Sequence, residues 1–462
     1  MVNDPRTLRT HPELRSHASF PLFKSVGEKP KSRIEKLLSL FADVRAGEGV
    51  GALLMTVNVF ILLAAYYLLK PAREALILAE GGAEVKAYAS AGQALLLLLV
   101  IPFYGWIGSK VNRFILVAGS LAFFALNLAV FYVLGQAGAR EGVVFYIWLG
   151  IFNVFVISQF WAFANDIYTE GQGRRLFAFI GIGSSLGAWW GAAAAKSMVT
   201  GFGLTPYQLM AIAAAMLIVS LGFVWSVNRR ERRSAAPEAA ALADQKLDSE
   251  GGFQLIFRDR YLIWIAVLTI LLNVVNTGGE YILGKLVASE AIARFGDTAA
   301  SEAVRKQFIG GFYGGFFAWV NFLGFVLQAG AVSRLMRYAG VRGSLFVLPC
   351  ISLTSYAVLA GAPILGVVRA VKILENSTDY SLQNTVKQAL WLPTTREAKY
   401  KAKAAVDTFF MRFGDVLSAG IVAAGSALGA GVRLFALFNV LLTAGWLWVA
   451  WQIKNEHRRR TL

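Results

Sequence analysis

Uncharged apolar runs of about 20 residues recur along the chain, and they restrict its fold more than any other feature. The run from Gly49 to Leu69 contains no charged residue. As a helix, a run of this length spans the hydrocarbon core of a bilayer. The composition agrees, because 56% hydrophobic and 16% charged residues make the chain too apolar for a soluble protein of this size. The pattern predicts an all-α polytopic membrane protein.

Twelve such runs can be marked, and short polar loops separate most of them. Residues 229–260 form the one long break, which begins with a cluster of arginines and continues through an Ala/Pro/Glu stretch. This composition is typical of a flexible linker, here a cytoplasmic one. The expected spans are 50–69, 87–108, 114–134, 143–165, 176–195, 206–228, 261–283, 307–332, 343–360, 363–385, 404–428 and 432–453.

The linker divides the spans into two sets of six. We therefore expect five segments along the chain. They are a basic, amphipathic cytoplasmic segment over 1–48, a six-helix bundle over 49–228, the linker over 229–260, a second six-helix bundle over 261–453 and a basic cytoplasmic tail over 454–462.

The positive charge of the chain follows the predicted topology. Every second loop is basic, as are both termini, whereas the intervening loops are nearly uncharged or carry carboxylates as well. Cytoplasmic loops of membrane proteins are enriched in Lys and Arg. The bias places both termini in the cytoplasm and suggests a bacterial inner membrane. Membrane orientation also explains the net charge of +17, so no nucleic-acid partner is needed to explain it.

The two halves resemble each other. The loop after the second span has the sequence GWIGSKVNRF, and the loop after the eighth has GAVSRLMRYAG. The fourth span ends in FANDI and the tenth passes through SLQNTVK, each before a basic loop. Equivalent features are offset by roughly 210–225 residues, which indicates two parallel repeats. The arrangement resembles the twelve-helix plan of the major facilitator superfamily.

Small residues and the lack of reactive clusters limit the chemistry. Gly183, Gly187 and Gly191 are four residues apart, and glycines 310, 311, 314 and 315 repeat that spacing, which predicts close helix packing. All three histidines lie in polar tails, and the single cysteine, Cys350, is expected to be a small buried hydrophobe. We expect no metal, no cofactor and no enzymatic activity.

The segment that closes the first span, YYLLKPARE, carries charges around a proline. Pro71 lacks an amide hydrogen and crowds the carbonyl of Tyr67, so a bend or break is expected there. Lys70, Arg73 and Glu74 then have two interpretations. They belong to an anion-binding site, because charges inside a membrane are costly, or the cations mark the end of the span and extend to the headgroups.

Other polar residues lie within the predicted spans. Asn273, Asn276 and Glu280 share one face of the seventh span, which we expect to face a central cavity. In the tenth span, residues 369, 372, 375 and 379 are charged at helical spacing and are expected to neutralise one another. The candidate substrate-binding residues are Lys70, Arg73, Glu74, Asn153, Asn273, Asn276, Glu280, Asp379, Asn384 and Lys387.

A second group of charges lies near the predicted cytoplasmic ends of spans. Lys403 and Asp407 are four residues apart and are expected to pair. Salt bridges at such positions would lock one face of a transporter and break when that face opens. The candidate gating residues are Asp166, Arg174, Arg175, Lys403, Asp407, Arg412 and Asp415.

The charge balance of the candidate residues suggests a substrate class. Cations within the first and tenth spans and the adjoining loops outnumber the carboxylates expected to point inward. A cationic cavity concentrates anions, and separated cations suit a multiply charged one such as a phosphate ester. Aromatic residues in the first and fourth spans could stack on a planar base. They are Tyr66, Tyr67, Phe160, Trp161 and Phe163.

Three stretches resemble the ATP/ADP translocases of obligate intracellular bacteria and plastids, a major facilitator-like family. They are YYLLKPAREALILAEGGAE, SQFWAFANDIYTEGQGRRLFAFIGIGSSLGA and YSLQNTVKQALWLPTTREAKYKAKAAVDTFFMRFGDVLSAG. The resemblance covers residues 50–453 and implies exchange of ATP for ADP through a site of essential Lys and Glu residues. It places Arg73 where the family tends to have lysine, and it makes Lys387 the retained lysine of the Tyr-Ser-Leu motif.

The chain departs from the family at two acidic positions. One falls between Leu149 and Asn153, where this sequence has no carboxylate. The other falls on Asn276, with Glu280 one turn further along. The cationic part of the pattern is retained and the acidic part is altered. The resemblance therefore supports an anion transporter more firmly than ATP/ADP exchange itself.

These observations lead to one expected function and two alternatives. We expect a secondary transporter of a phosphorylated anion, with ATP/ADP-type nucleotide exchange by alternating access as the first candidate. The sequence leaves the oligomeric state open and is compatible with a monomer. Lys70, Arg73 and Lys387 would hold phosphates. One alternative is a proton-coupled carrier of another organic anion, in which Glu280, Asp379 or Asp407 titrates. The other is a membrane sensor or scaffold that transports nothing.

Overall fold

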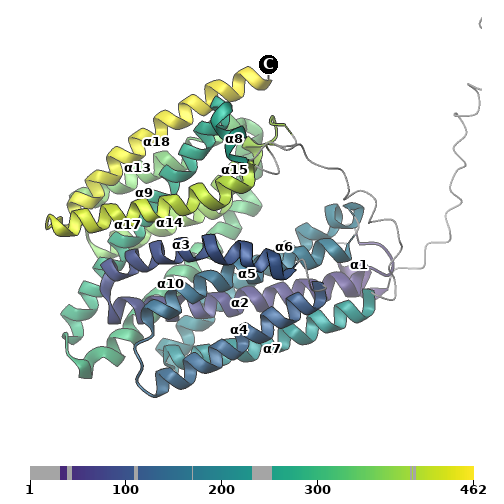
Figure 1. The fold of residues 1–462 in the computed structure, drawn as a ribbon, viewed down its shortest axis with the longest axis horizontal. Coiled ribbons are helices and arrows are strands. Elements are labelled where there is room, and N and C mark those ends of the chain that lie inside the picture. Colours follow the sequence, from purple (N-terminus) through teal and green to yellow (C-terminus); the bar gives the residue numbers. More distant parts are fainter. Residues whose placement is uncertain are drawn as a thin grey trace, which may run out of the picture.

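The protein is described here by a computed structural model that covers residues 32–38, 44–108, 113–168, 170–231, 252–395, 398 and 402–461. Within these ranges the chain is mostly helical, with short turns between the helices, and contains no strand. Most of the helices run along one common direction (Figure 1). The all-α expectation is confirmed.

The helices follow the apolar runs, with several short π-helical segments between them. In chain order they are α1 Arg33–Leu38, α2 Gly49–Glu80, α3 Gly82–Gly108, α4 Arg113–Gln136, α5 Gly142–Ile167, α6 Glu170–Gly201, α7 Pro206–Glu231, α8 Gly252–Arg258, α9 Arg260–Phe295, η3 Ala299–Ser301, α10 Glu302–Leu327, η4 Gln328–Val332, α11 Ser333–Tyr338, α12 Gly340–Ser344, α13 Val347–Gly361, α14 Leu365–Thr378, η5 Asp379–Gln383, α15 Asn384–Leu390, α16 Lys403–Ala405, η7 Val406–Phe410, α17 Met411–Ala427 and α18 Val432–Thr461.

Eleven helices in the described part of the chain are long and apolar enough to cross a membrane. The expected span over 363–385 is not among them, because it carries too many charges. It nevertheless forms the continuous helical segment α14–η5–α15, and α14 packs against α9, α10 and α13. The twelve-span architecture agrees with this arrangement.

The helices form two bundles that pack against each other. In the first, α2 contacts α5, α6 and α7, and in the second, α9 contacts α17 and α18. Figure 1 shows α2, α4 and α7 on the lower side of the molecule and α9, α13 and α18 on the upper side. Across the boundary, α10 packs on α2 and α6, and α17 packs on α3. Residues from opposite ends of the sequence therefore meet between the bundles.

The four-residue glycine spacing brings α6 against α2. A Cβ on Gly183, Gly187 or Gly191 would lie only 2.4, 2.3 and 2.3 Å from a backbone oxygen of α2. A side chain at any of the three would push the helices apart. The predicted small-residue packing is confirmed.

Pro71 does not break the first span. Helix α2 is continuous from Gly49 to Glu80 with Pro71 inside it. The expected break at Pro71 is therefore wrong, and the helix continues for seven residues beyond Arg73. The proline removes one helical hydrogen bond, but neighbouring helices hold the segment in place, as they do for many prolines in membrane helices.

Several segment boundaries differ from expectation. Helix α7 extends to Glu231 and α8 occupies residues 252–258, so both ends of the expected linker are helical. Helix α18 continues through the basic tail to Thr461. The expected N-terminal amphipathic helix is described only as α1, whose Glu35 accepts a hydrogen bond from the Gly47 backbone N–H at 2.7 Å. Residues 1–31 and 39–43 lie outside the described part.

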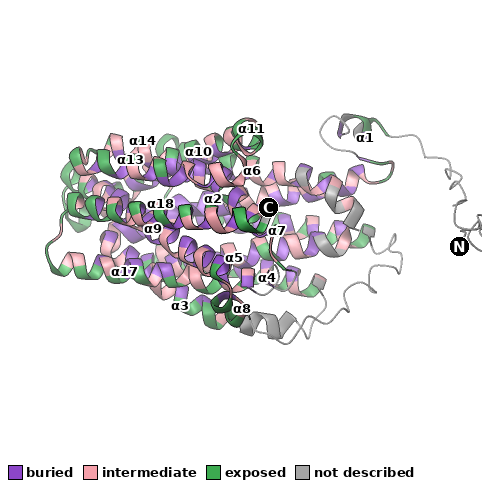
Figure 2. Ribbon diagram, turned by 90° about the horizontal axis from the view of Figure 1, so that it is seen from above, coloured by how far each residue is buried: buried purple, intermediate pink, exposed green. Residues whose placement is uncertain are grey.

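The surface of the bundle is apolar. Each long helix carries buried, intermediate and exposed residues side by side (Figure 2). Large hydrophobic residues such as Leu99, Leu126 and Leu441 are exposed, as expected for side chains that face lipid. Cys350 belongs to this surface, so its expected burial is wrong. In a membrane protein an apolar residue can face outward at no cost.

Candidate functional site

A cavity of about 140 Å³ lies between the two bundles. Each bundle supplies part of its wall, mainly from α2 and α3 on one side and from α9 and α14 on the other. The lining residues are Lys70, Arg73, Ala83, Lys86, Ala87, Ser90, Tyr146, Asn276, Thr277, Glu280, Tyr281, Phe317, Asn376 and Tyr380.

Lys70 reaches the cavity from the middle of the long helix α2 and is surrounded by aromatic rings. Its Nζ lies 4.0 Å from the ring centroid of Phe317 and 5.2 Å from that of Tyr67. It also lies 3.4 Å from the hydroxyl oxygen of Tyr380. The side chain is 8% exposed and has no ion-pair partner within the described ranges. Cation–π contacts offset only part of the cost of burying this charge.

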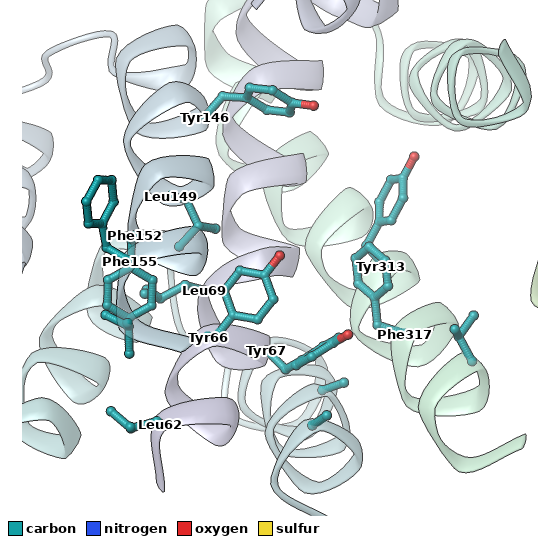
Figure 3. Packing of buried hydrophobic residues seen from close by; sticks show 14 of the residues in the cluster. Leu62, Tyr66, Tyr67, Leu69, Tyr146, Leu149, Phe152, Phe155, Tyr313 and Phe317 are labelled. Atoms are coloured by element: carbon teal, nitrogen blue, oxygen red, sulfur yellow. The ribbon is translucent and has the colours of Figure 1, made fainter. Parts of the chain in front are cut away.

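Aromatic packing holds this part of α2 in place. Tyr67 and Phe317 approach each other from α2 and α10, with ring centroids 6.3 Å apart. Tyr66 packs on Phe152 of α5 in the opposite direction. Figure 3 shows these rings together with Tyr146 of α5, which lies beside the neighbouring turns of α2. The rings that contact Lys70 itself come from α2, α10 and η5, and α5 supports the α2 ring of Tyr66 from behind.

Arg73 and Glu74 form an ion pair next to Lys70. The Nε of Arg73 lies 3.1 Å from Oε1 of Glu74, and Lys86 Nζ of α3 lies 2.7 Å from Oε2 of the same carboxylate. The guanidinium of Arg73 also stacks over Tyr146, 4.4 Å from its ring centroid. Glu74 is only 1% exposed, so it is buried between two cations that compensate its charge.

The opposite wall holds a second buried lysine. Lys372 is fully buried, and its Nζ lies 2.9 Å from Oε2 of Glu375 and 3.0 Å from Oδ1 of Asn276. Glu375 also accepts hydrogen bonds from Ser352 and Tyr356. Gly279 makes room for the group, because a Cβ there would lie 2.8 Å from the lysine Nζ. This cluster is fully paired.

Glu280 lies between the two walls. Its Oε1 is 3.8 Å from Lys372 Nζ and accepts a hydrogen bond of 2.9 Å from Asn376. Its Oε2 is 3.9 Å from Lys86 Nζ, which belongs to the first bundle. Glu280 thus links the bundles through two long-range cation contacts.

The charges of the two walls do not cancel. The cations are Lys70, Arg73, Lys86 and Lys372, and the carboxylates with which they form ion pairs are Glu74, Glu280 and Glu375. There is one more cation than carboxylate among these described residues, and Lys70 is the cation that has no carboxylate partner. Within the described wall the cavity therefore carries one surplus positive charge.

The bundles are joined at one end. We call the end opposite both described chain termini, where α2 ends and α3 begins, the closed end. Here Lys306 of α10 pairs with Glu80 at 2.8 Å, and Lys285 of α9 pairs with Glu84. Glutamine 307 donates a hydrogen bond to the carbonyl of Val199 across the same boundary.

At the other end, which we call the terminal end, the ion pairs stay inside one bundle. Arg175 of α6 pairs with Glu48, just before α2, at 2.8 Å. Arg460 of α18 pairs with Asp259, just before α9. Among the described residues, the ion pairs between the bundles all lie in the cavity wall or at the closed end.

The structure brings part of the predicted substrate set together. Lys70, Arg73, Asn276 and Glu280 line the cavity, with Glu74 directly behind Arg73. Five other candidates do not line it. They are Asn153, Asn273, Asp379, Asn384 and Lys387.

Asn273 binds α17 instead of facing the cavity. Its amide donates hydrogen bonds to the carbonyl of Met411 at 2.7 Å and to Asp415 at 2.8 Å. The three polar residues of the seventh span therefore do not all face the cavity. Asn273 lies inside the second bundle, whereas Asn276 and Glu280 line the cavity. A polar face can be shared between helix packing and a cavity, which spacing alone does not resolve.

The predicted gating residues have mixed outcomes. Arg175 forms the ion pair at the terminal end of the first bundle, and Arg412 pairs with Asp415 at 3.1 Å. No ion pair joins Lys403 to Asp407, although both are described, so that prediction is wrong. Asp407 lies in the π-helix η7, where the wider turn removes the spacing on which an i, i+4 pair depends. The side chains of Asp166 and Arg174 lie outside the described part of the structure.

The charges of the tenth span pair only in part. Lys372 and Glu375 form the expected ion pair. Arg369 instead lies over the ring of Phe312, and Asp379 begins the π-helix η5 without a described ion-pair partner. The predicted mutual neutralisation of all four charges is wrong, because helix packing directs them to different sides.

Sequence reasoning missed several cavity residues. Lys86 was assigned to a loop, because the second span was expected to begin at residue 87, whereas α3 begins at Gly82. A lone lysine next to a long apolar run was the available signal. Tyr146 and Phe317 had no distinguishing signal among the many aromatic residues of the chain, whereas Tyr380 begins the Tyr-Ser-Leu motif that the family resemblance singled out.

Comparisons with known proteins bear on this arrangement. Residues 344–457 match the family model described as TLC ATP/ADP transporter. ADP,ATP carrier protein 1 of Chlamydia trachomatis serovar D is 25% identical over 379 residues, which cover 71% of this chain and 67% of that protein. ADP,ATP carrier protein 2 of the same organism is 23% identical over 471 residues, covering 86% of each.

Solved structures share the fold at low sequence identity. A POT family transporter in complex with 5-aminolevulinic acid has a TM-score of 0.61 at 13% identity, over 89% of this chain and 97% of that one. The nucleoside transporter NupG has a TM-score of 0.58 at 14% identity, over 86% and 98%. About a quarter of the chain thus matches a family model of ATP/ADP transporters, most of the chain is similar to two ADP,ATP carriers, and solved transporter structures share its fold.

Proposed function

We propose that the protein is a secondary transporter that exchanges nucleotides across a membrane by alternating access, without changing them chemically. The observation that carries this proposal is the buried Lys70, which has no carboxylate partner among the described residues, whereas the other cations around the cavity are paired. A phosphate group would supply the missing negative charge. The similarity to carriers named for ADP and ATP supports a nucleotide as the source of that phosphate.

The cavity offers distinct contacts for the two ends of a nucleotide. Lys70 and Arg73 would bind phosphate oxygens through charge-assisted hydrogen bonds. The rings of Tyr146, Phe317 and Tyr380 line the same cavity and could stack on a base. At about 140 Å³ the cavity is smaller than the roughly 300–1,000 Å³ of pockets that enclose drug-sized ligands. The bundles must therefore move apart to admit a whole nucleotide.

The ion pairs suggest how access alternates. The basic loops favour a cytoplasmic position for both termini and an inner-membrane location, which would make the closed end the external one. In this conformation the external end is held by Glu80–Lys306 and Glu84–Lys285. Substrate would enter from the cytoplasm, and these pairs would break when the bundles rock the other way. One chain supplies the whole cavity wall, so a monomer suffices.

Exchange in proteoliposomes tests the proposal. Purified full-length protein is reconstituted with unlabelled ADP inside, and labelled ATP is added outside. We expect uptake that depends on internal nucleotide and is competed by ADP. Uptake that is independent of internal nucleotide, or an absence of nucleotide uptake beside transport of another organic anion, would overturn nucleotide exchange.

A proton-coupled carrier of an organic anion is the second candidate. The observation in its favour is Glu280, a carboxylate in the cavity lining that contacts cations of both bundles only at 3.8 and 3.9 Å. A carboxylate held this loosely could take up a proton as the bundles move apart. Uptake that a protonophore abolishes, in vesicles without internal substrate, would favour this function over exchange.

A further inference from the structure

Two cations from different bundles meet on the outer side of α10. Lys196 belongs to α6 and Arg369 to α14. A Cβ on Gly315 of α10 would lie 3.1 Å from Nη2 of Arg369 and 3.4 and 3.6 Å from Cδ and Cε of Lys196. Both side chains therefore extend to the same point beside a helix that has no side chain there.

No negative charge compensates this pair. Neither Lys196 nor Arg369 forms an ion pair within the described ranges, and the guanidinium of Arg369 lies 5.2 Å from the ring centroid of Phe312. Two like charges that approach each other repel, more strongly near a low-dielectric medium than in water. The arrangement becomes favourable when an anion lies between them.

The surface next to this pair is apolar and outward-facing. Trp319 and Phe322 follow Gly315 by four and seven residues, so they lie on the same side of α10. They are 56% and 41% exposed. Trp189, two turns before Lys196 on α6, is 40% exposed and packs 5.9 Å from Phe322. The seam between α6 and α10 thus faces the acyl chains of the bilayer.

The two cations lie near the membrane interface. Lys196 is five residues from the end of α6 at Gly201, and Arg369 is four residues from the start of α14 at Leu365. At 1.5 Å per residue these positions are about 6–8 Å below the helix ends. A crevice of about 430 Å³ opens at this level, lined by Arg369 with Thr200, Gln307 and Phe308.

We propose that Lys196 and Arg369 together bind the phosphate group of an anionic phospholipid, which bridges the two bundles at the closed end. The phosphate lies between the two cations beside Gly315, the rest of the headgroup extends into the crevice lined by Arg369 and Gly311, and the acyl chains descend along Trp189, Trp319 and Phe322. The bound lipid links α6 of the first bundle to α14 of the second. It therefore stabilises the closed end alongside the Glu80–Lys306 pair.

Lipid retention tests this proposal in the full-length protein. The protein is reconstituted in mixed phosphatidylglycerol and phosphatidylcholine of identical acyl chains, extracted in mild detergent and analysed by native mass spectrometry. In Lys196→Gln and Arg369→Gln we expect the retained ratio of phosphatidylglycerol to phosphatidylcholine to fall about fivefold each. Lys196→Arg with Arg369→Lys keeps both charges and should retain the lipid.

Arg433→Gln provides the matched control. Arg433 is an exposed cation at the start of α18 on the same side of the membrane, and no second cation is described beside it. It should leave the ratio unchanged. Equal retention in all variants would overturn the proposal. So would displacement of phosphatidylglycerol by millimolar inorganic phosphate in the wild-type protein, because the site would then bind a soluble anion.

Discussion

Two buried lysines lie on opposite sides of the cavity, Lys70 in its lining and Lys372 behind Asn276 and Glu280, and they are held in opposite ways. Lys372 of α14 is fully buried and pairs with Glu375, Asn276 and, at longer range, Glu280. Lys70 of α2 is nearly as buried, but aromatic rings replace the carboxylates. A paired buried charge stabilises a fold that would suffer from its loss, whereas an unpaired one is a cost that a ligand can offset. On this difference we propose a structural role for Lys372 and a binding role for Lys70.

The largest expected effect comes from Lys372→Met. The substitution leaves Glu375 buried without its cation, and removing one partner of a buried ion pair costs about 3–5 kcal/mol. We expect a lower melting temperature in detergent and poor recovery of folded protein. Lys372→Met with Glu375→Gln removes both charges and should recover much of the stability. An unchanged melting temperature of the single variant would exclude the structural role of Lys372.

The second effect concerns Lys70→Ala. Loss of a charge-assisted hydrogen bond to phosphate, at about 1.5–3 kcal/mol, should weaken nucleotide exchange by on the order of 100-fold. The melting temperature should stay level or rise, because an uncompensated charge has been removed. Lys70→Arg keeps the charge and should retain part of the exchange. Full exchange by Lys70→Ala would place the phosphate site elsewhere in the cavity.

Glu280→Gln is expected to have a smaller effect and to strengthen nucleotide binding, whereas Lys70→Ala weakens it. Lys86 keeps Glu74 and Lys372 keeps Glu375 as partners, so stability should change little. The surplus positive charge of the cavity increases, and the KM for nucleotide should fall by roughly tenfold. Concentration-dependent exchange measures KM directly. A rise in KM would mean that Glu280 itself contacts the substrate.

The smallest expected effect concerns a buried carboxylate, Glu141, which like Lys70 lacks a described partner of opposite charge. Glu141 precedes α5, is 4% exposed and has no described hydrogen-bond partner. Burial and the nearby Glu80 raise the pKa of Glu141 from 4.5 to about 7, while Lys306 opposes the shift. Tyr207 of α7 and Glu302 of α10 also surround Lys306 in this group. Protonation of Glu141 therefore stabilises the closed end.

Because this pKa is raised, the closed end should lose stability as the pH rises from about 4.5 to about 7. Labelling of Ser90→Cys by an impermeant thiol reagent, in a Cys350→Ser background, reports opening of that end. Labelling should increase over this pH range, and Glu141→Gln should abolish the increase. A pH response that survives Glu141→Gln would assign the titration to another group.

Glu48 gives the matched contrast at the terminal end. Hydrogen bonds from Arg175 and the Arg45 backbone lower the pKa of Glu48 against the opposing effect of burial. Its stabilising contribution is therefore present at neutral pH and lost as the pH falls below 4.5. Glu48→Gln should reduce stability at pH 7 and have no effect in acid, the reverse of Glu141→Gln.

Much of the architecture follows from local patterns in the sequence. Apolar runs predict spans because a helix in lipid satisfies its own backbone hydrogen bonds. The glycine spacing predicts close packing of α6, since three glycines on one face leave room for a backbone. The charges of YYLLKPARE point to a site because charge is costly in a membrane. These features depend on residues that are close in sequence.

Only the tertiary structure decided which charges are paired. Lys86 and Glu280 are nearly 200 positions apart, and no local pattern brings them together. Four charges of the tenth span share helical spacing, yet packing pairs Lys372 and directs Arg369 to the outer seam. The continuity of α2 through Pro71 likewise depends on neighbouring helices. Whether a buried lysine is structural or free to bind an anion depends on its partners in space, and the chain fold alone selects them.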